Sequence, residues 1–245
     1  MKKEILNHEY IKQEITTNQE KTTPRYRWSH GATDNHMGDG ILVYSLMYFF
    51  KSKLSVCLGS GGGFIPRIMS LVNNDLQLEG FDRSESQVIL VDAFNGVNGK
   101  PDWDIGDFFP NAFQVDVLKT TTEKAYYEYF VKRDMKIDLL WIDADHSFEG
   151  VKKDFDLYSE IISDKGIIIV HDTDKEYVDN FIETERHEEY DLSGPSEFIK
   201  TIDDKKYELL NLFNYGIEKD FPSSTGLTIV RKKWTTDFVD NLGRL

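Results

Sequence analysis

The segment Ile137-Asp-Leu-Leu-Trp-Ile-Asp-Ala-Asp-His-Ser-Phe-Glu-Gly150 joins an apolar run to a cluster of ionisable residues. Its first six positions are nearly all apolar, which is typical of a central parallel strand covered on both faces. Asp143, Asp145 and His146 follow directly. Ligands of open α/β sheets bind at the carboxyl ends of the strands, so these side chains indicate a functional site. The alternative is that Asp145 or Ser147 only caps the following helix.

A second polar cluster follows the next predicted strand, at His171, Asp172 and Asp174. Apolar runs along the chain predict seven strands in total, at 54–58, 87–91, 112–117, 137–142, 167–170, 207–213 and 226–231. Helices are predicted at 41–50, an apolar segment that Asp39-Gly40 opens, and at 122–133. A third helix follows the strand at 137–142, carries an apolar stripe from Val151 to Ile162 and ends at Lys165-Gly166. Residues 73–83 have the composition of an inserted loop, and residues 175–205 have that of a charged, partly helical excursion. Strands that alternate with helices predict an α/β fold with a largely parallel sheet.

The bulk composition limits the class of protein. A length of 245 residues with 40% hydrophobic residues suits one domain, which we place at 40–245 after an extension at 1–39. The net charge of −14 disfavours nucleic acid as a partner. The longest apolar run, 41–50, is shorter than the ~20 residues of a membrane helix, and residues 1–17 do not resemble a secretory signal. With the single cysteine Cys57, these features predict a cytoplasmic protein without a disulfide framework.

The extension contains two different segments. Residues 3–19 have a weak amphipathic pattern, which predicts a solvated helix that could also mediate a homodimer. Residues 22–40 lack periodicity and predict a loop. Because this loop carries Tyr26, Trp28, His30 and His36, we expect it to face a substrate.

A glycine-rich turn, Gly59-Ser-Gly-Gly-Gly63, lies between the first strand and a helix that contains Pro66 near its start. Glycines let the backbone approach a ligand closely, and the helix amino terminus behind them favours polar or anionic groups. The dinucleotide fingerprint G-x-G-x-x-G requires a small residue where this chain has Phe64, whereas G-x-G-x-G is satisfied. Asp92 ends the second strand, where it either binds ribose hydroxyls or caps a helix. Asp116, at the predicted end of the third strand, is placed to contact an adenine.

The glycine turn, Asp92, the run I-D-A-D-H-S-F-E-G at 142–150 and V-H-D-T at 170–173 together resemble class I S-adenosylmethionine-dependent methyltransferases. The pattern is most similar to metal-dependent O-methyltransferases of sugars and small hydroxylated molecules, and it covers about residues 40–232. The resemblance implies a Rossmann-like, doubly wound α/β fold. Its seven-stranded sheet would be mostly parallel with an antiparallel last strand, and helices would cover both faces.

The resemblance also implies roles for individual residues. It implies an S-adenosylmethionine site formed by Gly59, Ser60, Gly61, Gly63, Asp92, Asp116 and Asp143. It implies a divalent cation, Mg²⁺ or Mn²⁺, held by Asp143, His171 and Asp172, with His146 as general base beside Asp145. Two positions depart from the family pattern. Cys57 replaces a usual acid, and His171 replaces a usual acid in the metal pair, which weakens the expected cation affinity.

The chemistry of these side chains is consistent with the roles that the resemblance implies. Methyl transfer to oxygen requires a hydroxyl that is at least partly deprotonated, and a divalent cation lowers the pKa of such a hydroxyl. Carboxylate oxygens suit Mg²⁺ or Mn²⁺, and a histidine can accept the proton. The alternative for His146 is a structural hydrogen bond to a neighbouring carboxylate. The resemblance and this chemistry together predict an O-methyltransferase of a small hydroxylated molecule, with a sugar or glycan as the first choice of acceptor and a phenol as the open alternative. Two alternatives stay open, an NAD(P)-dependent oxidoreductase, which Phe64 disfavours, and a non-catalytic cofactor-binding module.

Overall fold

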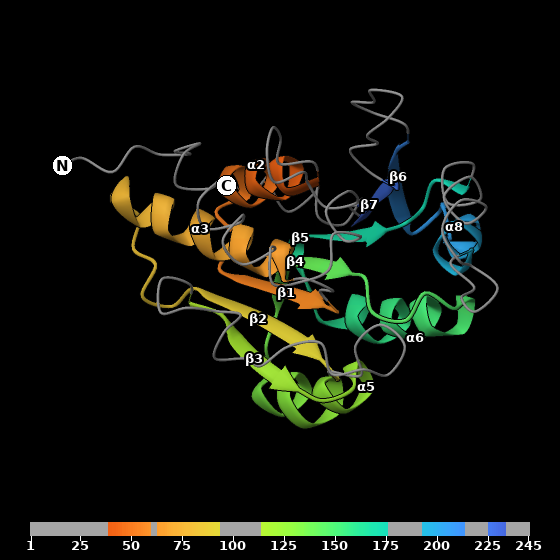
Figure 1. The fold of residues 1–245 in the computed structure, drawn as a ribbon, viewed down its shortest axis with the longest axis horizontal. Coiled ribbons are helices and arrows are strands. Elements are labelled where there is room, and N and C mark those ends of the chain that lie inside the picture. Colours follow the sequence, from red (N-terminus) through yellow and green to blue (C-terminus); the bar gives the residue numbers. More distant parts are fainter. Residues whose placement is uncertain (1–38, 60–62, 94–113, 176–192, 214–224, 234–245) are drawn as a thin grey trace, which may run out of the picture.

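The computed structural model describes residues 39–59, 63–93, 114–175, 193–213 and 225–233. Their core is one seven-stranded sheet with the order β3-β2-β1-β4-β5-β7-β6 (Figure 1). The strands from β3 to β5 pair in parallel, and β7 is antiparallel to both of its neighbours. The bounds are β1 Leu54–Leu58, β2 Gln87–Asp92, β3 Asp116–Lys119, β4 Ile137–Ile142, β5 Ile162–His171, β6 Tyr207–Leu212 and β7 Leu227–Lys232. This arrangement confirms the predicted fold class.

Helices cover both faces of the sheet, because the central strands carry apolar side chains on each side (Figure 1). Helices α2 (Asp39–Phe50) and α3 (Phe64–Leu78) pack on one face. The other face is covered by α5 (Thr122–Ala125), α6 (Phe148–Tyr158), α8 (Gly194–Phe198) and short helical turns. Successive residues of β4 serve opposite layers, since Trp141 belongs to the first core and Ile142 to the second.

Three predicted element boundaries are wrong. Residues 73–78 continue helix α3 and do not begin an inserted loop. Strand β3 begins at Asp116, where the sequence suggested that it ended. Strand β5 already begins at Ile162, so Lys165-Gly166 lies inside it and does not end the preceding helix. At this point the register against β4 shifts, and a Cβ on Gly166 would approach the carbonyl oxygen of Ile137 to 2.7 Å.

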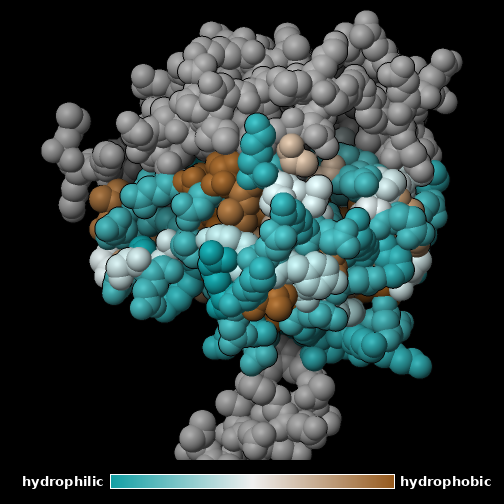
Figure 2. All heavy atoms as spheres, turned by 90° about the horizontal axis from the view of Figure 1, so that it is seen from below, coloured by the Kyte–Doolittle hydropathy of each residue, from teal (hydrophilic) through white to brown (hydrophobic). Residues whose placement is uncertain are grey.

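The described surface is largely polar on one side of the molecule (Figure 2). Seen from the side of α5, it is mainly hydrophilic with small separate hydrophobic areas (Figure 2). Among the described residues, no helix combines the length and apolar character needed to span a bilayer. The predicted helix at 3–19 and most of the loop at 22–40 lie outside the described residues, so the division at residue 39 stays a prediction.

Candidate active site at the carboxyl ends of the strands

The ends of β1 and β4 lie unusually close together because Gly59 has no side chain. Gly59 adopts a φ of 70°, and its added Cβ would lie 2.3 Å from the carbonyl oxygen of Asp143. The Asp143 amide donates to the Leu58 carbonyl oxygen at 2.9 Å, which continues the ladder past the end of both strands. Gly59 therefore fixes the position from which the Asp143 side chain enters the site.

The end of β5 is held in an uncommon backbone conformation. Asp172 has a φ of 58°, in the left-handed region that non-glycine residues rarely occupy. The segment before β7 secures it, because the Thr225 hydroxyl donates to the Asp172 carboxylate. The Asp174 amide also donates to the Thr225 carbonyl oxygen at 3.0 Å, and the Thr173 amide donates to that of Gly226 at 3.3 Å. These contacts turn the Asp172 side chain towards β4.

Asp143, His146, His171 and Asp172 meet at these strand ends and form what we call the acid–histidine cluster. Nε2 of His146 lies 3.1 Å from Oδ1 of Asp143 and 2.9 Å from Oδ2 of Asp172. Nδ1 of His171 lies 3.2 Å from Oδ1 of each of the same two aspartates. The two carboxylates are therefore shared by two imidazole rings, which confirms that the residues following β4 and β5 converge.

The two histidines differ in exposure. The His146 side chain is 29% exposed and borders the surface, whereas that of His171 is 1% exposed. The His171 ring packs on the Trp141 ring at 5.1 Å between centroids, and its Nε2 lies 3.1 Å from Oδ2 of the buried Asp39. His146 is thus accessible to a substrate, while His171 is a buried hydrogen-bonding bridge behind the carboxylates.

The electrostatics of the cluster favour charged forms. Burial disfavours protonation of His146, but hydrogen bonds to Asp143 and Asp172 outweigh it and raise its pKa to about 10. Burial opposes the same change in His171, and the charges of Asp172 and Asp143 raise its pKa well above the usual value. Burial opposes ionisation of Asp172, yet both histidines hold its pKa far below its normal range. At neutral pH His146 is an imidazolium between two carboxylates and has no free lone pair to accept a proton.

A divalent cation fits part of this cluster. Among the described residues, one group of three has ligand atoms within 4.8 Å of one another, namely Asp143, His146 and Asp172. Two carboxylates and an imidazole are a suitable donor set for Mn²⁺ or Mg²⁺. This group differs from the predicted one, because His146 takes the place of His171, whose two nitrogens already face Asp39 and the two carboxylates.

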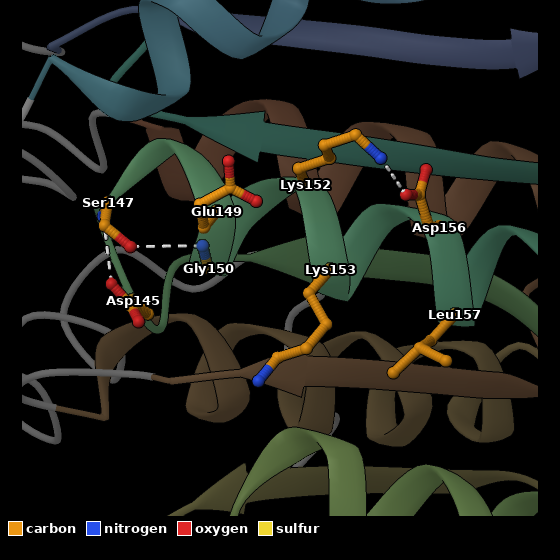
Figure 3. A pocket seen from close by; sticks show the side chains of 8 residues that line it. All are labelled: Asp145, Ser147, Glu149, Gly150, Lys152, Lys153, Asp156 and Leu157. Atoms are coloured by element: carbon orange, nitrogen blue, oxygen red, sulfur yellow. Dashed lines mark hydrogen bonds and ion pairs between the residues drawn. The ribbon is translucent and has the colours of Figure 1, made fainter.

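Asp145 lies close in sequence to the cluster but points elsewhere. Its Oδ1 accepts a hydrogen bond from the Ser147 amide at 2.9 Å, and the Ser147 hydroxyl accepts one from the Gly150 amide at 3.1 Å (Figure 3). A Cβ on Gly150 would lie 2.3 Å from Cγ of Asp145, so the carboxyl group packs directly on that glycine. The structure therefore supports the capping alternative for Asp145 and Ser147.

The same two residues border a shallow hollow of about 460 Å³ on the outer flank of α6 (Figure 3). Its lining is mainly charged and includes Glu149, Lys152, Lys153 and Asp156. No member of the acid–histidine cluster lines it. We therefore place the candidate site at the strand ends and not in this hollow.

The predicted cofactor residues lie in different places. Gly59 and Gly63 flank the turn between β1 and α3, each with a φ of 70°, whereas Ser60 and Gly61 lie outside the described residues. Asp92 ends β2, next to β1. The buried Cys57 thiol has a raised pKa, first because of burial and then because of the charges of Asp143 and Asp92. Both acids therefore lie at the same edge of the sheet as the glycine turn.

Asp116 lies at the opposite end of the sheet, which corrects its assignment to an adenine site. It is the first residue of β3 and pairs with Ile89, while Lys119 pairs with Asp92 at the carboxyl ends. Three residues of strand separate Asp116 from that edge by about 10 Å. Its carboxylate instead accepts a hydrogen bond from the Gln87 side chain at 3.3 Å.

Two residues of the site were missed by sequence reasoning. Asp39 appeared only as the start of an apolar helix, and Thr225 lay just before a predicted strand. The sequence feature that could have identified Asp39 is its position as an acidic residue in the first turn of α2. Helix α8 was also expected only as part of a charged excursion. Its first residue, Gly194, packs on the loop after β4, where an added Cβ would lie 2.2 Å from the His146 carbonyl oxygen.

Comparisons with known proteins place this geometry in context. Residues 56–173 match the family model of a methyltransferase domain. No curated protein matches the sequence. The fold is similar to an O-methyltransferase from Bacillus cereus solved with SAH, with a TM-score of 0.61 at 14% identity, covering 94% of this chain and 93% of that one.

Two further solved structures share the fold. One is the O-methyltransferase TomG from Streptomyces achromogenes, involved in tomaymycin synthesis and solved with SAM, with a TM-score of 0.63, 10% identity and coverage of 94% and 92%. The other is the SAH-bound methyltransferase PaMTH1 from Podospora anserina, with a TM-score of 0.54, 14% identity and coverage of 93% and 87%. At these identities the likeness describes the fold.

Proposed function

We propose that the chain is a methyltransferase of the class I fold that transfers a methyl group from S-adenosylmethionine to a hydroxyl oxygen of a small molecule. The observation that carries the proposal is the convergence of Asp143, His146 and Asp172 at the carboxyl ends of β4 and β5. The glycine turn after β1 lies at the same edge, where Gly59 contacts the backbone of Asp143. Methyl donor and acceptor oxygen would therefore meet there.

We assign the methionine part of the cofactor to the turn that Gly59 and Gly63 flank, including Ser60 and Gly61. Asp92, at the end of β2, is proposed to accept hydrogen bonds from the ribose hydroxyls. Asp143 is closest to both halves of the site, because it follows β4 and packs beside Gly59. The SAM- and SAH-bound neighbours support this choice of cofactor.

We assign a divalent cation, Mg²⁺ or Mn²⁺, to the carboxylates of Asp143 and Asp172. His146, the third member of this group, is not a ligand in the proposal, because an imidazole nitrogen that binds a cation cannot also accept a proton. When bound, it would supply a Lewis acid that lowers the pKa of the acceptor hydroxyl. Asp143 and Asp172 would supply the carboxylate ligands. His171 contacts both carboxylates from the buried side and so restrains their orientation.

His146 is proposed as the general base because it is the exposed member of the cluster. Its pKa of about 10 keeps it protonated while both carboxylates face it. The His146 imidazole can take the proton of the substrate hydroxyl only once the carboxylates of Asp143 and Asp172 have bound other groups. The proposed base therefore becomes active on assembly of the complete site.

The acceptor we propose is a sugar or a similar hydroxylated molecule, since the cluster handles a hydroxyl proton and the net charge of −14 disfavours polyanions. The loop at 22–40, with Tyr26 and Trp28, is assigned to acceptor binding from its sequence alone. The cytoplasmic location and the homodimer stay predictions.

The proposal is tested by incubating the full chain with methyl-labelled S-adenosylmethionine, Mg²⁺ or Mn²⁺, and panels of sugars and phenols. We expect saturable cofactor binding and transfer of label to an acceptor oxygen, reduced by chelation of the cation. Absence of S-adenosylmethionine binding would remove the proposal, and binding without transfer to any acceptor would favour the non-catalytic module.

An NAD(P)-dependent oxidoreductase is the second candidate from sequence, and a thermal shift separates it from the first. A ligand at 100 times its dissociation constant stabilises the fold by about 2.7 kcal/mol, which raises the Tm of a domain of this size by roughly 5–11 °C. We expect this shift with S-adenosylmethionine and none with NAD⁺ or NADP⁺. The reverse result would replace the proposed reaction.

A further inference from the structure

Asp39 contacts the acid–histidine cluster from a distant part of the chain. It is the first residue of α2, its side chain is 0% exposed, and its Oδ2 lies 3.1 Å from Nε2 of His171. The two residues are 132 positions apart in the sequence. An acid in the first turn of a helix gains from the helix dipole at the surface too, so the dipole does not account for the burial of Asp39. A buried carboxylate needs a specific partner, and His171 is one.

His171 transmits this contact to the other side of its ring. Its Nδ1 lies 3.2 Å from Oδ1 of Asp143 and 3.2 Å from Oδ1 of Asp172, opposite the nitrogen that faces Asp39. The stacking on Trp141 restrains the plane of the ring. Rotation of the ring would break the contact with Asp39 and both contacts with the aspartates together. Asp39, together with the Thr225 hydroxyl oxygen at 3.2 Å from the same Nε2, therefore restrains where His171 can offer a hydrogen bond to the carboxylates.

We propose that Asp39 is a positioning residue for the active site, acting through His171 on the carboxylates of Asp143 and Asp172. The same two carboxylates contact His146 on their outer side. Their orientation governs both the affinity of the site for a divalent cation and the placement of His146. The inference rests on the proposed function for the cation and the reaction, but the placement of His146 can be measured without either.

The experiment compares four full-length variants with the wild type. Asp39→Ala removes the contact, Asp39→Asn keeps an oxygen that can accept from Nε2 of His171, and Asp39→Glu keeps the charge but moves it by one methylene. Tyr44→Phe is the matched control, because it removes another side-chain hydrogen bond of α2, the one from the Tyr44 hydroxyl to Asp75 at 2.7 Å. Three quantities are measured, namely Mn²⁺ affinity, the ring ¹⁵N chemical shifts of His146 at one fixed pH, and the Kd for S-adenosylmethionine.

We expect Asp39→Ala to weaken Mn²⁺ binding by about 10- to 100-fold, a range typical for loss of a group that orients a metal ligand. The ¹⁵N shifts of His146 should change in the same variant, while the Kd for S-adenosylmethionine stays within about twofold of the wild type. Asp39→Asn should restore most of the Mn²⁺ affinity, and Tyr44→Phe should match the wild type. If Asp39→Ala does not fold, Asp39→Glu should show the same two changes because its carboxylate is displaced.

Unchanged Mn²⁺ affinity and unchanged His146 shifts in both Asp39→Ala and Asp39→Glu would overturn the proposal. An Asp39→Asn variant as impaired as the alanine variant would assign the effect to charge and would also overturn a positioning role. If the wild type binds neither Mn²⁺ nor S-adenosylmethionine, the proposed function fails, and the His146 shifts alone then decide the role of Asp39.

Discussion

His146 and Asp145 are adjacent, yet the structure gives them different roles. His146 faces the carboxylates of Asp143 and Asp172, whereas Asp145 accepts a hydrogen bond from the Ser147 amide. We predict that His146→Ala lowers the rate of methyl transfer by about 10²- to 10⁴-fold, the usual contribution of general base catalysis. The Kd for S-adenosylmethionine should not change. Single-turnover rates and cofactor titrations measure the two effects separately.

The control is Asp145→Ala, which should retain near wild-type turnover and lose about 1 kcal/mol of unfolding free energy through the helix start. Full activity in His146→Ala would remove the assignment of the base. A severe loss of turnover in Asp145→Ala would show that Asp145 takes part in catalysis.

Asp154 is a buried carboxyl group whose ionisation is unfavourable in the folded state. It is 1% exposed on α6, accepts a hydrogen bond from the Thr122 hydroxyl at 2.5 Å, and its Oδ2 has no hydrogen-bond partner among the described residues. Burial raises its pKa to about 6. Between about pH 4 and pH 6 the folded state keeps this proton while the unfolded chain loses it, so Asp154 lowers stability progressively as the pH rises.

We therefore predict that Asp154→Asn stabilises the protein by about 1–3 kcal/mol at about pH 7.5 and by little at about pH 4. Urea unfolding at both pH values measures the difference. Asp156→Asn, on the exposed side of α6, serves as control and should change stability by less than about 0.5 kcal/mol. Equal effects of Asp154→Asn at the two pH values would contradict the assigned pKa.

The acid and imidazole groups of the site were predictable from sequence, whereas the residues behind them were not. Asp143, His146 and Asp172 directly follow buried apolar runs, and strand ends meet at one edge of a parallel sheet. Thr225 reaches Asp172 from 53 positions away, and no local pattern encodes that contact. The burial of His171 was not predictable for the same reason, because it depends on where α2 packs.

At the scale of elements, the central strand β4 was located well and the edge strand β3 poorly. Strand β4 was predicted with its observed bounds because it is buried on both faces. Strand β3 lies at the edge of the sheet, and its exposed and half-buried residues give little apolar signal. Because the predicted bounds of β3 were wrong by a few residues, Asp116 was expected at the carboxyl end of the strand, whereas it lies at the amino end.

The contact between β1 and β4 yields a prediction about a single glycine. Gly59→Ala places a Cβ 2.3 Å from the Asp143 carbonyl oxygen and 2.5 Å from Cα of Ala144, which are backbone atoms of the site. Gly80→Ala is a matched control, because Gly80 also has positive φ, at 91°, but nothing lies within 4 Å of its added Cβ. Both variants lose about 1–2 kcal/mol from backbone strain. Gly59→Ala should lose at least about 2 kcal/mol more through overlap.

Displacement of Asp143 in Gly59→Ala should also reduce Mn²⁺ binding, whereas Gly80→Ala should bind Mn²⁺ like the wild type. Urea unfolding and Mn²⁺ titration distinguish the two variants. Similar stability losses in both would show that the ends of β1 and β4 are not as close as described.

At the scale of the whole molecule, the predicted boundary between extension and domain runs directly beside the site. The sequence predicted a domain that begins at residue 40, which would assign Asp39 to the extension. Asp39 is instead buried in α2 and contacts His171. We therefore propose a boundary before Asp39, so that the acceptor segment at 22–38 is directly joined to a residue of the site.

This boundary leads to a prediction for two truncated chains. A chain that starts at Met37 retains Asp39 and every described element, so it should fold, bind S-adenosylmethionine and bind Mn²⁺ with wild-type affinity. Its methyl transfer should fall about 100-fold, because the residues assigned to acceptor positioning are gone. A chain that starts at Ile41 also loses Asp39, and its Mn²⁺ affinity should fall as well. Wild-type turnover by the first chain would show that residues 1–36 do not position the acceptor, and equal Mn²⁺ affinity of the two chains would place the boundary after Asp39.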